Sequence, residues 1–321
     1  MPAEWEPQSA VQLTWPHEGT DWAPILPEIT AVYEEMAREI RKRESLIIVD
    51  DIPHNDTWAR DHGFITVEET SDLSPQTSDL ILLDFKFNGW GEKFPADLDN
   101  QINKQLFDNG LVKGVYEDHL DFVLEGGSIE SDGKGTVFTT ACCLLAPHRN
   151  QPLTAQQIED RLKEYLGAER IVWLHHGSLI GDDTDGHIDT LVRICPDDTL
   201  LYTGGDEAHP DLYEMEHELQ TLRTIEGKPY RLLKLPLPRP IYDTTAISHQ
   251  PSAINRLPAT YANYLVINGA VLVPTYNQPD LDQEAMHVIQ QAFPDREIVG
   301  IDCRAVIKQH GSLHCCTMQY Y

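Results

Sequence analysis

The chain has 321 residues, of which 41% are hydrophobic, and this composition predicts a folded protein rather than a disordered one. Its 52 acidic residues against 24 basic ones give a formal charge of −28, which argues against nucleic acid or an anionic membrane surface as a partner. The charge favours encounters with cations, but solubility explains it more simply, so charge alone names no substrate.

The start of the chain and the cysteines bear on the cellular location. The first residues, MPAEWEPQSAVQLTWPHEG, lack a basic region followed by an apolar stretch, and no later segment approaches the roughly 20 apolar residues that span a bilayer. We therefore expect a soluble, cytoplasmic protein. Two adjacent pairs, Cys142–Cys143 and Cys315–Cys316, suit neither a disulfide framework nor a CxxC zinc site, so reduced thiols are expected. Cys142 and Cys143 stand in an apolar, strand-like context and are expected to be buried and inert.

Short β-rich runs alternate with amphipathic helices, and no low-complexity linker divides the chain, so we expect one compact α/β domain over residues 1–321. Apolar residues at helical spacing predict a helix over Ile25–Arg43, and further helices are predicted at Ala155–Leu166 and Gln283–Phe293. Strands are predicted at Phe64–Val67, Leu80–Phe85, Thr136–Thr140, Arg170–Leu174, Leu191–Ile194, Leu200–Thr203, Leu265–Ile267, Val271–Pro274 and Glu297–Ile301. The order strand, polar turn, strand, helix recurs, which suggests structural repetition without fixing a period.

The segment NDTWARDHGF places Asp61 beside aromatic residues and directly before a predicted strand. A carboxylate at such a strand end could clamp a flat cation, because guanidinium pairs with carboxylate through two parallel hydrogen bonds and also stacks on rings. The structural alternative is an internal salt bridge between Asp61 and Arg60.

The segment LEGGSIESDG carries Glu125 ahead of two glycines. The permissive glycine backbone allows a close approach between this carboxylate and a bound group. Taken alone the signal is weak, since the same letters describe an ordinary bend.

The segment GDDTDGHIDT separates His187 from Asp189 by two positions and leads into a strand-like run. If the pair belongs to that strand, both side chains face one side, where the imidazole could handle protons and the carboxylate could hold a cation. An Asp-rich surface turn is the alternative interpretation.

Near the end of the chain, His314 is followed by Cys315 and Cys316. If residues 312–318 form a strand, the two thiols point to opposite faces, so only one can meet the carboxylates, and we assign Cys315 that place. Two buried core cysteines are the alternative.

These motifs, in order, resemble those of the agmatine deiminases, in the peptidylarginine deiminase-like family of the guanidino-modifying, or pentein, superfamily. The resemblance covers nearly the whole chain, through MPAEW, TWPHEGTDW, NDTWARDHG, FNGWGEKF, LEGGSIESDGKGT, GDDTDGHIDT, RLPATYANYLVINGAVLVPTYN and IDCRAVIKQHGSLHCCTMQY. It implies an α/β pentein fold, a five-fold pseudosymmetric propeller of ββαβ units around a central channel that holds the active site.

The resemblance also implies residue roles. Cys315 would be the nucleophile and His187 the general acid and base. Asp61 and Asp189 would clamp the guanidinium, and Glu125 would orient His187 and the substrate. The implied reaction is hydrolysis of agmatine to N-carbamoylputrescine and ammonia, without cofactor or metal, on a small cationic guanidino substrate.

Two further expectations concern charge and substrate choice. Three carboxylates near Cys315 should disfavour its thiolate, so we hypothesise a neutral thiol that ionises when the cationic substrate binds. The amine at the far end of agmatine would prefer aromatic or acidic neighbours, for which Trp90, Asp182 and Asp183 are candidates, although a packed core tryptophan is an alternative for Trp90.

Other functions fit parts of the sequence. Free or peptidyl arginine could replace agmatine on the same fold, and a noncatalytic polyamine-binding protein would keep the acidic clamp without needing Cys315. A cysteine protease would use the thiol and His187 but leaves the carboxylates without a role. The sequence is also compatible with a homo-oligomer. A metal-dependent hydrolase could draw its ligands from His54, Asp61, His62, His187 and Asp189.

Overall fold

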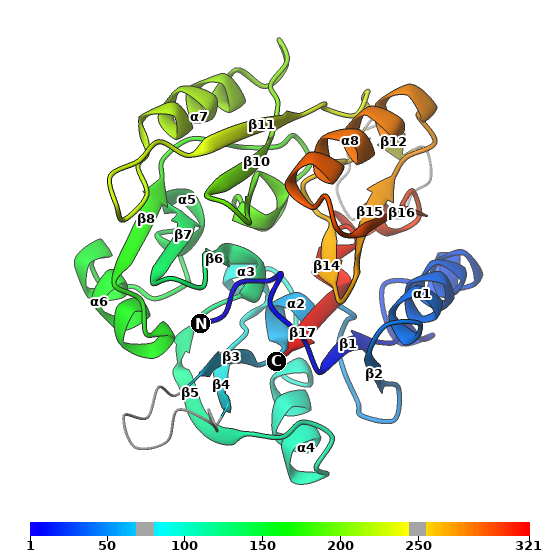
Figure 1. The fold of residues 1–321 in the computed structure, drawn as a ribbon. Coiled ribbons are helices and arrows are strands. Elements are labelled where there is room, and N and C mark those ends of the chain that lie inside the picture. The colour runs from blue at the N-terminus through cyan, green and yellow to red at the C-terminus, as the bar shows by residue number, and fades with distance from the viewer. Residues whose placement is uncertain (69–79, 244–254) are drawn as a thin grey trace.

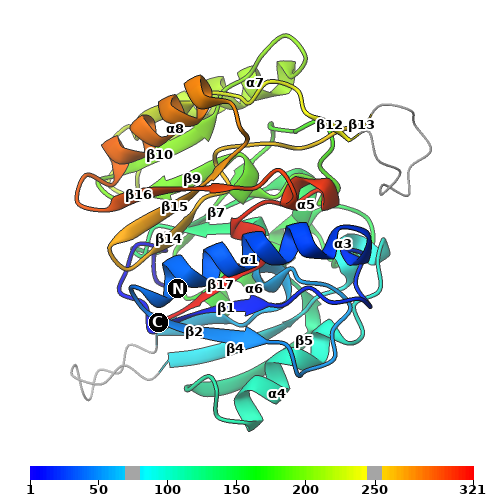
Figure 2. The ribbon, with the colours of Figure 1, turned by 90° about the vertical axis from the view of Figure 1, so that its right-hand side faces the viewer.

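The computed structural model describes residues 1–68, 80–243 and 255–321. The strands of these residues form five three-stranded sheets and one two-stranded ribbon of β12 (Tyr242–Asp243) and β13 (Asn255–Arg256). Figure 1 shows the sheets arranged around the middle of the molecule, with the longer helices at its periphery. In the side view of Figure 2 the strands run across the picture, along the viewing direction of Figure 1.

All five sheets share one pattern, in which a middle strand pairs antiparallel with one neighbour and parallel with the other. Four sheets are built from strands that follow one another in the chain: β3 (Ile65–Glu68), β4 (Leu80–Lys86), β5 (Val115–Val123); β6 (Ile129–Ser131), β7 (Thr136–Thr140), β8 (Arg170–Leu174); β9 (Val192–Cys195), β10 (Thr199–Thr203), β11 (Arg231–Leu235); β14 (Leu265–Ile267), β15 (Ala270–Thr275), β16 (Glu297–Asp302).

The fifth sheet joins the two ends of the chain. Its middle strand, β1 (Ala10–Thr14), pairs parallel with β2 (Ser45–Val49) and antiparallel with β17 (Thr317–Tyr320). The last strand of the chain therefore completes the first unit and closes the ring. This closure brings the segment before β17, which carries Cys315, to the middle of the molecule.

The five longest described helices each connect the middle strand of one sheet to its parallel partner, because parallel strands need a crossover connection. These helices are α1 (Leu26–Arg41), α4 (Ile102–Asp108), α6 (Ala155–Leu166), α7 (Pro210–Thr221) and α8 (Pro279–Ala292). Each sheet with its helix is thus one ββαβ unit, and the five-unit α/β arrangement expected from the resemblance is confirmed. Among the described helices, none combines the length and apolar character needed to cross a membrane.

Local sequence explains where these helices begin and end. In α6 the Thr154 hydroxyl accepts from the Gln157 amide while the Gln157 side chain accepts from the Thr154 amide, and Gly167 ends the helix at φ 62°. Its buried residues, Ile158, Leu162 and Leu166, recur every four positions. Helix α8 begins at Pro279, four residues before the predicted start, because proline is well suited to the first helical position and Asp280 and Asp282 favour the positive end of the helix dipole.

Short helical turns lie at strand ends and between the units. They are η1 (Ala23–Ile25), α2 (Ala59–His62), α3 (Gly89–Glu92), η2 (Asp99–Gln101), η3 (Gly126–Ser128), α5 (Ala141–Leu144), η4 (Ile188–Thr190), η5 (Val306–Gln309) and η6 (His314–Cys316). Turn α2 packs against η3 and η6, and η3 packs against η4. The turns therefore meet where several units come together, and they carry the polar residues singled out in the sequence.

Candidate functional site

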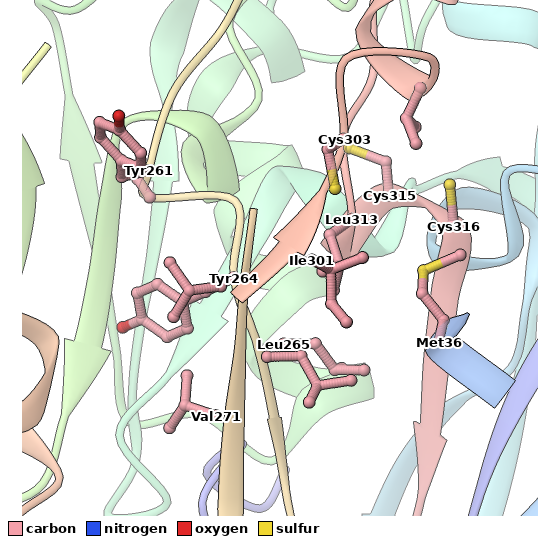
Figure 3. Close-up of a cluster of buried hydrophobic side chains, with 14 of the residues drawn as sticks. Met36, Tyr261, Tyr264, Leu265, Val271, Ile301, Cys303, Leu313, Cys315 and Cys316 are labelled. Atoms are coloured by element: carbon pink, nitrogen blue, oxygen red, sulfur yellow. The ribbon is translucent and has the colours of Figure 1, made fainter. Parts of the chain in front are cut away.

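Five predicted site residues are brought together by these turns. Their exposed fractions are 4% for Cys315, 3% for Asp61 and 0% for Glu125, His187 and Asp189. Figure 3 shows Cys315 and Cys316 at one end of an apolar cluster that includes Leu313 and Cys303, with the two side chains leaving the chain in different directions. The site is therefore a set of polar groups set into the hydrophobic core.

Gly127 shows how closely three of these side chains converge. A side-chain carbon placed on Gly127 would lie 2.6 Å from His187 Nδ1, 2.9 Å from Asp61 Oδ1 and 3.2 Å from Asp189 Oδ2. Any residue with a side chain would intrude on the imidazole and both carboxylates, so the glycine is required by the close approach. The second glycine of the EGG motif thus has a specific structural reason.

His187 presents its two ring nitrogens to different neighbours. Nδ1 is 3.7 Å from Asp61 Oδ1, and Nε2 is 3.5 Å from Glu125 Oε2. At these distances neither nitrogen has a hydrogen-bond partner among the described residues. Burial opposes protonation of the ring, but Asp61, Cys143 and Glu125 outweigh it and raise the pKa of His187 well above its ordinary value.

Glu125 is held in place by Arg149, a residue that the sequence did not single out. The Arg149 Nε atom lies 2.9 Å from Glu125 Oε1, and its Nη1 lies 3.0 Å from Asp185 Oδ2. Burial acts to raise the pKa of Glu125, but the contacts with His187 and Arg149 prevail and lower it. Glu125 is thereby kept as an oriented carboxylate beside His187.

Asp61 receives two hydrogen bonds that fix its plane. Trp90 Nε1 donates to Oδ2 at 2.9 Å, and the Gly127 amide donates to Oδ1 at 3.0 Å. Burial, with Asp189 and Glu125 adding repulsion, raises the pKa of Asp61. The structural alternative for Asp61 is contradicted, because Arg60 turns away and bonds to Gln319.

Cys315 lies between Asp189 and Asn263. Its Sγ is 3.8 Å from Asp189 Oδ2 and 3.4 Å from Asn263 Oδ1. His314 Nδ1 is 2.7 Å from the same Asp189 oxygen, whereas Asp189 Oδ1 is buried and has no hydrogen-bond partner among the described residues. Burial, together with Asp189 and Asp61, raises the pKa of the Cys315 thiol well above its ordinary value, as the sequence led us to expect.

A second buried ion cluster lies on the other side of His314. His314 Nε2 is 3.0 Å from Glu4 Oε2, and Arg193 contacts both Glu4 and Glu130. The Arg193 Nη1 atom also donates to the Ala262 carbonyl at 3.0 Å. The side chain of His314 therefore connects the segment at the start of the chain to Asp189.

Several local predictions were wrong. His187 and Asp189 belong to η4 and its start, not to a strand, because Thr184 accepts from the His187 amide and Thr190 donates to its carbonyl. Cys315 lies in η6, and β17 begins only at Thr317. These turns still direct the predicted side chains to one place.

The cysteine pair at positions 142 and 143 also differs from expectation. Cys142 is exposed, contrary to the prediction that both thiols are buried. Cys143 is buried, and its Sγ is 3.8 Å from Glu125 Oε2. Strand β7 ends at Thr140, whose hydroxyl accepts from the Cys143 amide and starts the turn that directs this thiol to the site.

Trp90, Asp182 and Asp183 were predicted near the far end of the substrate. Trp90 is 7% exposed and bonds to Asp61, so the structure brings it to the site as a partner of that carboxylate. The oxygens of Asp182 accept from Thr184 and Gly186, which assigns this carboxylate to the turn. Asp183 is half-buried, and burial raises its pKa to about 6. Contact of Trp90 or Asp183 with a substrate remains a prediction.

The ligand set of the metal-hydrolase alternative is not gathered in one place. His54 directs its ring nitrogens to the carbonyl oxygens of Ile52 and Trp15, at 2.7 and 2.9 Å. His62 lies 3.3 Å from the Thr14 hydroxyl, and burial lowers its pKa to about 3. In the described parts of the chain, the two groups that could hold an ion are Glu125–Cys143–His187 and Glu4–Glu130–His314, and neither contains His54 or His62.

The fold and site together define a class of protein: a five-unit α/β ring of the pentein type with a thiol, an imidazole and carboxylates buried where the units meet. The chain belongs to the Porphyromonas-type peptidyl-arginine deiminase family, which it matches over residues 1–320. The resemblance found in the motifs is thereby confirmed.

Three similar proteins extend the comparison to individual deiminases. Agmatine deiminase from Medicago truncatula is 32% identical over 359 residues, covering 99% of this chain and 95% of that protein. A structure from Porphyromonas gingivalis, described as a candidate arginine deiminase, is 48% identical with a TM-score of 0.89, covering 100% and 97% of the chains. A substrate-bound cysteine-to-serine variant of C. jejuni agmatine deiminase is 35% identical with a TM-score of 0.88, covering 100% and 95%.

Proposed function

We propose that the protein hydrolyses agmatine to N-carbamoylputrescine and ammonia, with Cys315 as the nucleophile. The observation that supports this most strongly is the meeting of His187, Asp61 and Asp189 at Gly127, with Cys315 Sγ 3.8 Å from Asp189 Oδ2, in a site with little solvent exposure. A guanidinium carbon resists attack because its charge is delocalised, so it needs paired carboxylates to fix it and a strong nucleophile in line. The likeness to agmatine deiminases points the same way.

The first half-reaction forms a covalent intermediate. Asp61 and Asp189 hold the guanidinium, whose positive charge promotes release of the Cys315 thiol proton to solvent, and the resulting thiolate attacks the central carbon to give a tetrahedral adduct. His187 gives a proton to the departing nitrogen, the carbon–nitrogen bond breaks, and ammonia leaves a thiouronium on Cys315. His187 is suited to this step because its neighbours favour the protonated ring before the reaction.

The second half-reaction restores the enzyme. His187, now neutral, takes a proton from water, and the oxygen attacks the thiouronium carbon. Collapse of this second adduct breaks the carbon–sulfur bond and releases the ureido product. Glu125 lies 3.5 Å from Nε2 of His187, and Nδ1 is on the side of Asp61, so we assign proton transfer to Nδ1 and orientation to Glu125.

Substrate choice between agmatine and arginine depends on the far end of the molecule. Free arginine would need a cation for its carboxylate, but Arg149 already pairs with Glu125 and Asp185, and Lys93 pairs with Asp185. Agmatine carries an amine there, for which we propose Asp183 and Trp90 as neighbours. The 48% identity to a candidate arginine deiminase makes free or peptidyl arginine the alternative.

The wider setting follows from the same proposal. We infer a single catalytic domain over residues 1–321 that acts in the cytoplasm on a small cationic guanidino substrate. Neither nucleic acid nor a membrane is expected as a partner, because the net charge is −28. A homo-oligomer is compatible with this proposal.

Ammonia release tests the proposal. Wild-type protein is assayed in EDTA with agmatine, free arginine and a peptidyl arginine, beside Cys315→Ser and the matched control Cys316→Ser, whose thiol contacts the Ser312 carbonyl instead of a carboxylate. We expect release from agmatine that is lost in Cys315→Ser and kept in Cys316→Ser. Activity in Cys315→Ser would refute the nucleophile, and a preference for either arginine substrate would refute the choice of agmatine.

A further inference from the structure

Cys143 is a buried thiol beside the proposed acid and base of the reaction, and the mechanism gives it no step. It follows directly on Cys142, which is exposed. Its own side chain is fully buried, and its Sγ lies 3.8 Å from Glu125 Oε2. Turn α5 thus places one thiol of the pair on the surface and the other at the active site.

Cys143, Glu125 and His187 offer one sulfur, one oxygen and one nitrogen that all lie within 4.8 Å of one another. Each of the three residues has an exposed fraction of 0%. Both ring nitrogens of His187 lack a hydrogen-bond partner among the described residues, so Nε2 is available to a ligand on the side of Glu125 and Cys143. A buried thiol, carboxylate and imidazole are ligands that zinc accepts together.

We propose that Cys143, His187 and Glu125 form a binding site for a thiophilic divalent cation such as Zn²⁺, and that its occupation reversibly stops the enzyme. The spacing supports this. Tetrahedral zinc with ordinary bond lengths separates nitrogen from oxygen by about 3.4 Å and sulfur from oxygen by about 3.6 Å. The measured separations are 3.5 Å from His187 Nε2 to Glu125 Oε2 and 3.8 Å from Cys143 Sγ to the same oxygen. Two of the three ligand pairs are therefore already close to the required spacing, and the sulfur and nitrogen lie within 4.8 Å of each other.

The surroundings also hold these ligands in place. Arg149 Nε lies 2.9 Å from Glu125 Oε1 and also donates to Oε2 at 3.2 Å, so it fixes the carboxylate plane in the way outer-shell partners fix metal ligands. Burial raises the pKa of the Cys143 thiol to about 11, so the thiol is neutral in the free protein. Binding replaces the sulfur–hydrogen bond of Cys143 and the Nε2–hydrogen bond of the protonated His187 ring by bonds to the metal, and it releases both protons to solvent with no change of oxidation state.

The consequence for activity rests on the proposed function, whereas the binding does not. A cation on Nε2 of His187 and on Glu125 would replace the acidic imidazolium by a metal-bound imidazole, which is too weak an acid to protonate the leaving nitrogen from Nδ1. Three protein ligands leave one tetrahedral position for water. We therefore expect the bound cation to inhibit the enzyme, and we expect the deiminase reaction itself to proceed in EDTA.

Cobalt binding tests the site directly. Co²⁺ is added to metal-free wild-type protein and to variants, and the near-ultraviolet thiolate-to-cobalt absorption is recorded, because this band requires a sulfur ligand. The variants are Cys143→Ala, the matched surface control Cys142→Ala, and Cys315→Ser. We expect the band in wild type, Cys142→Ala and Cys315→Ser, and its loss in Cys143→Ala. Cys143→Ser, which nearly keeps the side-chain volume, replaces the alanine variant if that variant does not fold.

Inhibition provides the second measurement. We expect Zn²⁺ to lower ammonia release by wild type and Cys142→Ala by roughly tenfold or more, with recovery in excess EDTA, and to bind Cys143→Ala about tenfold or more weakly. A cobalt band that disappears in Cys315→Ser and persists in Cys143→Ala would overturn the proposal, because the metal would then bind the nucleophile. Absence of the band from wild type would also overturn it, whether or not the protein deiminates agmatine.

Discussion

Two clusters of buried or partly buried carboxylates lie on either side of His314, and they differ in how their charge is compensated. In one, Arg193 contacts both Glu4 and Glu130. In the other, Asp61 accepts from Trp90 and Gly127, and Asp189 contacts His314, but no described arginine or lysine pairs with either carboxylate. Glu130, Asp61 and Asp189 are buried and Glu4 is partly buried, so the main difference between the clusters is one of charge.

The comparison teaches what the second cluster is suited to bind. In the cluster of Glu4 and Glu130, the negative charge is balanced permanently by the guanidinium of Arg193, which is part of the chain. Asp61 and Asp189 have polar partners that orient them and an imidazole nearby, but no arginine or lysine among the described residues, so a guanidinium substrate can fulfil the same electrostatic function there. A buried carboxylate without a paired cation costs stability, a common feature of functional sites.

The largest expected effect is a loss of activity in variants of Asp61 and Asp189. Asp61→Asn and Asp189→Asn should each lower kcat/KM for agmatine by about 10²–10³-fold, because each removes one charge from the guanidinium clamp. For Asp61 the folded-state pKa is raised, so its ionised form costs stability once the pH passes that pKa. Asp61→Asn should therefore be at least as stable as wild type at pH 7, as measured by urea unfolding. A marked loss of stability would contradict the comparison.

In the cluster of Glu4, Glu130 and Arg193, removal of the charged side chain of Arg193 should lower stability. Arg193→Met leaves the buried Glu130 and the partly buried Glu4 without their cation and should lower the free energy of unfolding by about 3–5 kcal/mol. Arg239→Met is the matched control, since its salt bridge with Asp280 is exposed and should be worth about 0–1 kcal/mol. Equal losses in the two variants, measured by urea unfolding, would show that Arg193 is not compensating buried charge.

His314 joins the two clusters, and we expect it to act as a positioning residue for Asp189. His314→Ala removes the 2.7 Å contact with Asp189 and should raise KM for agmatine about tenfold, the equivalent of about 1.4 kcal/mol. His314→Asn can place an amide N–H near the position of Nδ1 and should recover part of this loss. Steady-state kinetics of both variants distinguish positioning from a general packing defect, which asparagine would not repair.

The smallest expected effect is at Trp90. Trp90→Phe keeps a ring in place but removes the donor to Asp61, and we expect kcat/KM to fall by about threefold to tenfold, mostly through KM. Trp58→Phe is the matched control, because its indole donates instead to Asp56. A larger loss in Trp58→Phe than in Trp90→Phe, in the same kinetic assay, would contradict the assignment of Trp90 to the site.

Many of the site residues and the repeated unit of the fold could be predicted from the sequence, but only where a local sequence motif identified them. The motifs around Asp61, Glu125, His187, Asp189 and Cys315 identified residues that the structure brings together, and the recurring strand and helix order indicated the repeated unit. Local strand assignments failed at residues 187–189 and 314–316, because side-chain hydrogen bonds from Thr184 and Thr190, among others, favour turns there.

Contacts between distant parts of the chain could not be predicted in this way. Arg149 meets Glu125 across 24 positions, and His314 meets Asp189 across 125. Asn263 stands within a motif that was recognised, yet nothing local marks it as the neighbour of Cys315. Cys143 was interpreted from its apolar neighbours, and its turn toward Glu125 depends on the end of β7 at Thr140.

The most direct test of the comparison is the ionisation of Cys315 with and without a guanidinium. The near-ultraviolet thiolate absorbance of wild type minus Cys315→Ser is followed as a function of pH, in the absence and presence of methylguanidinium. In the free protein, burial together with Asp189, Asp61 and Cys316 raises the pKa of this thiol, so little thiolate should form near neutral pH. We predict that the guanidinium lowers this pKa, so that the thiolate forms at lower pH. Identical titration curves with and without methylguanidinium would contradict the claim that the positive charge of the substrate balances the carboxylates of this site.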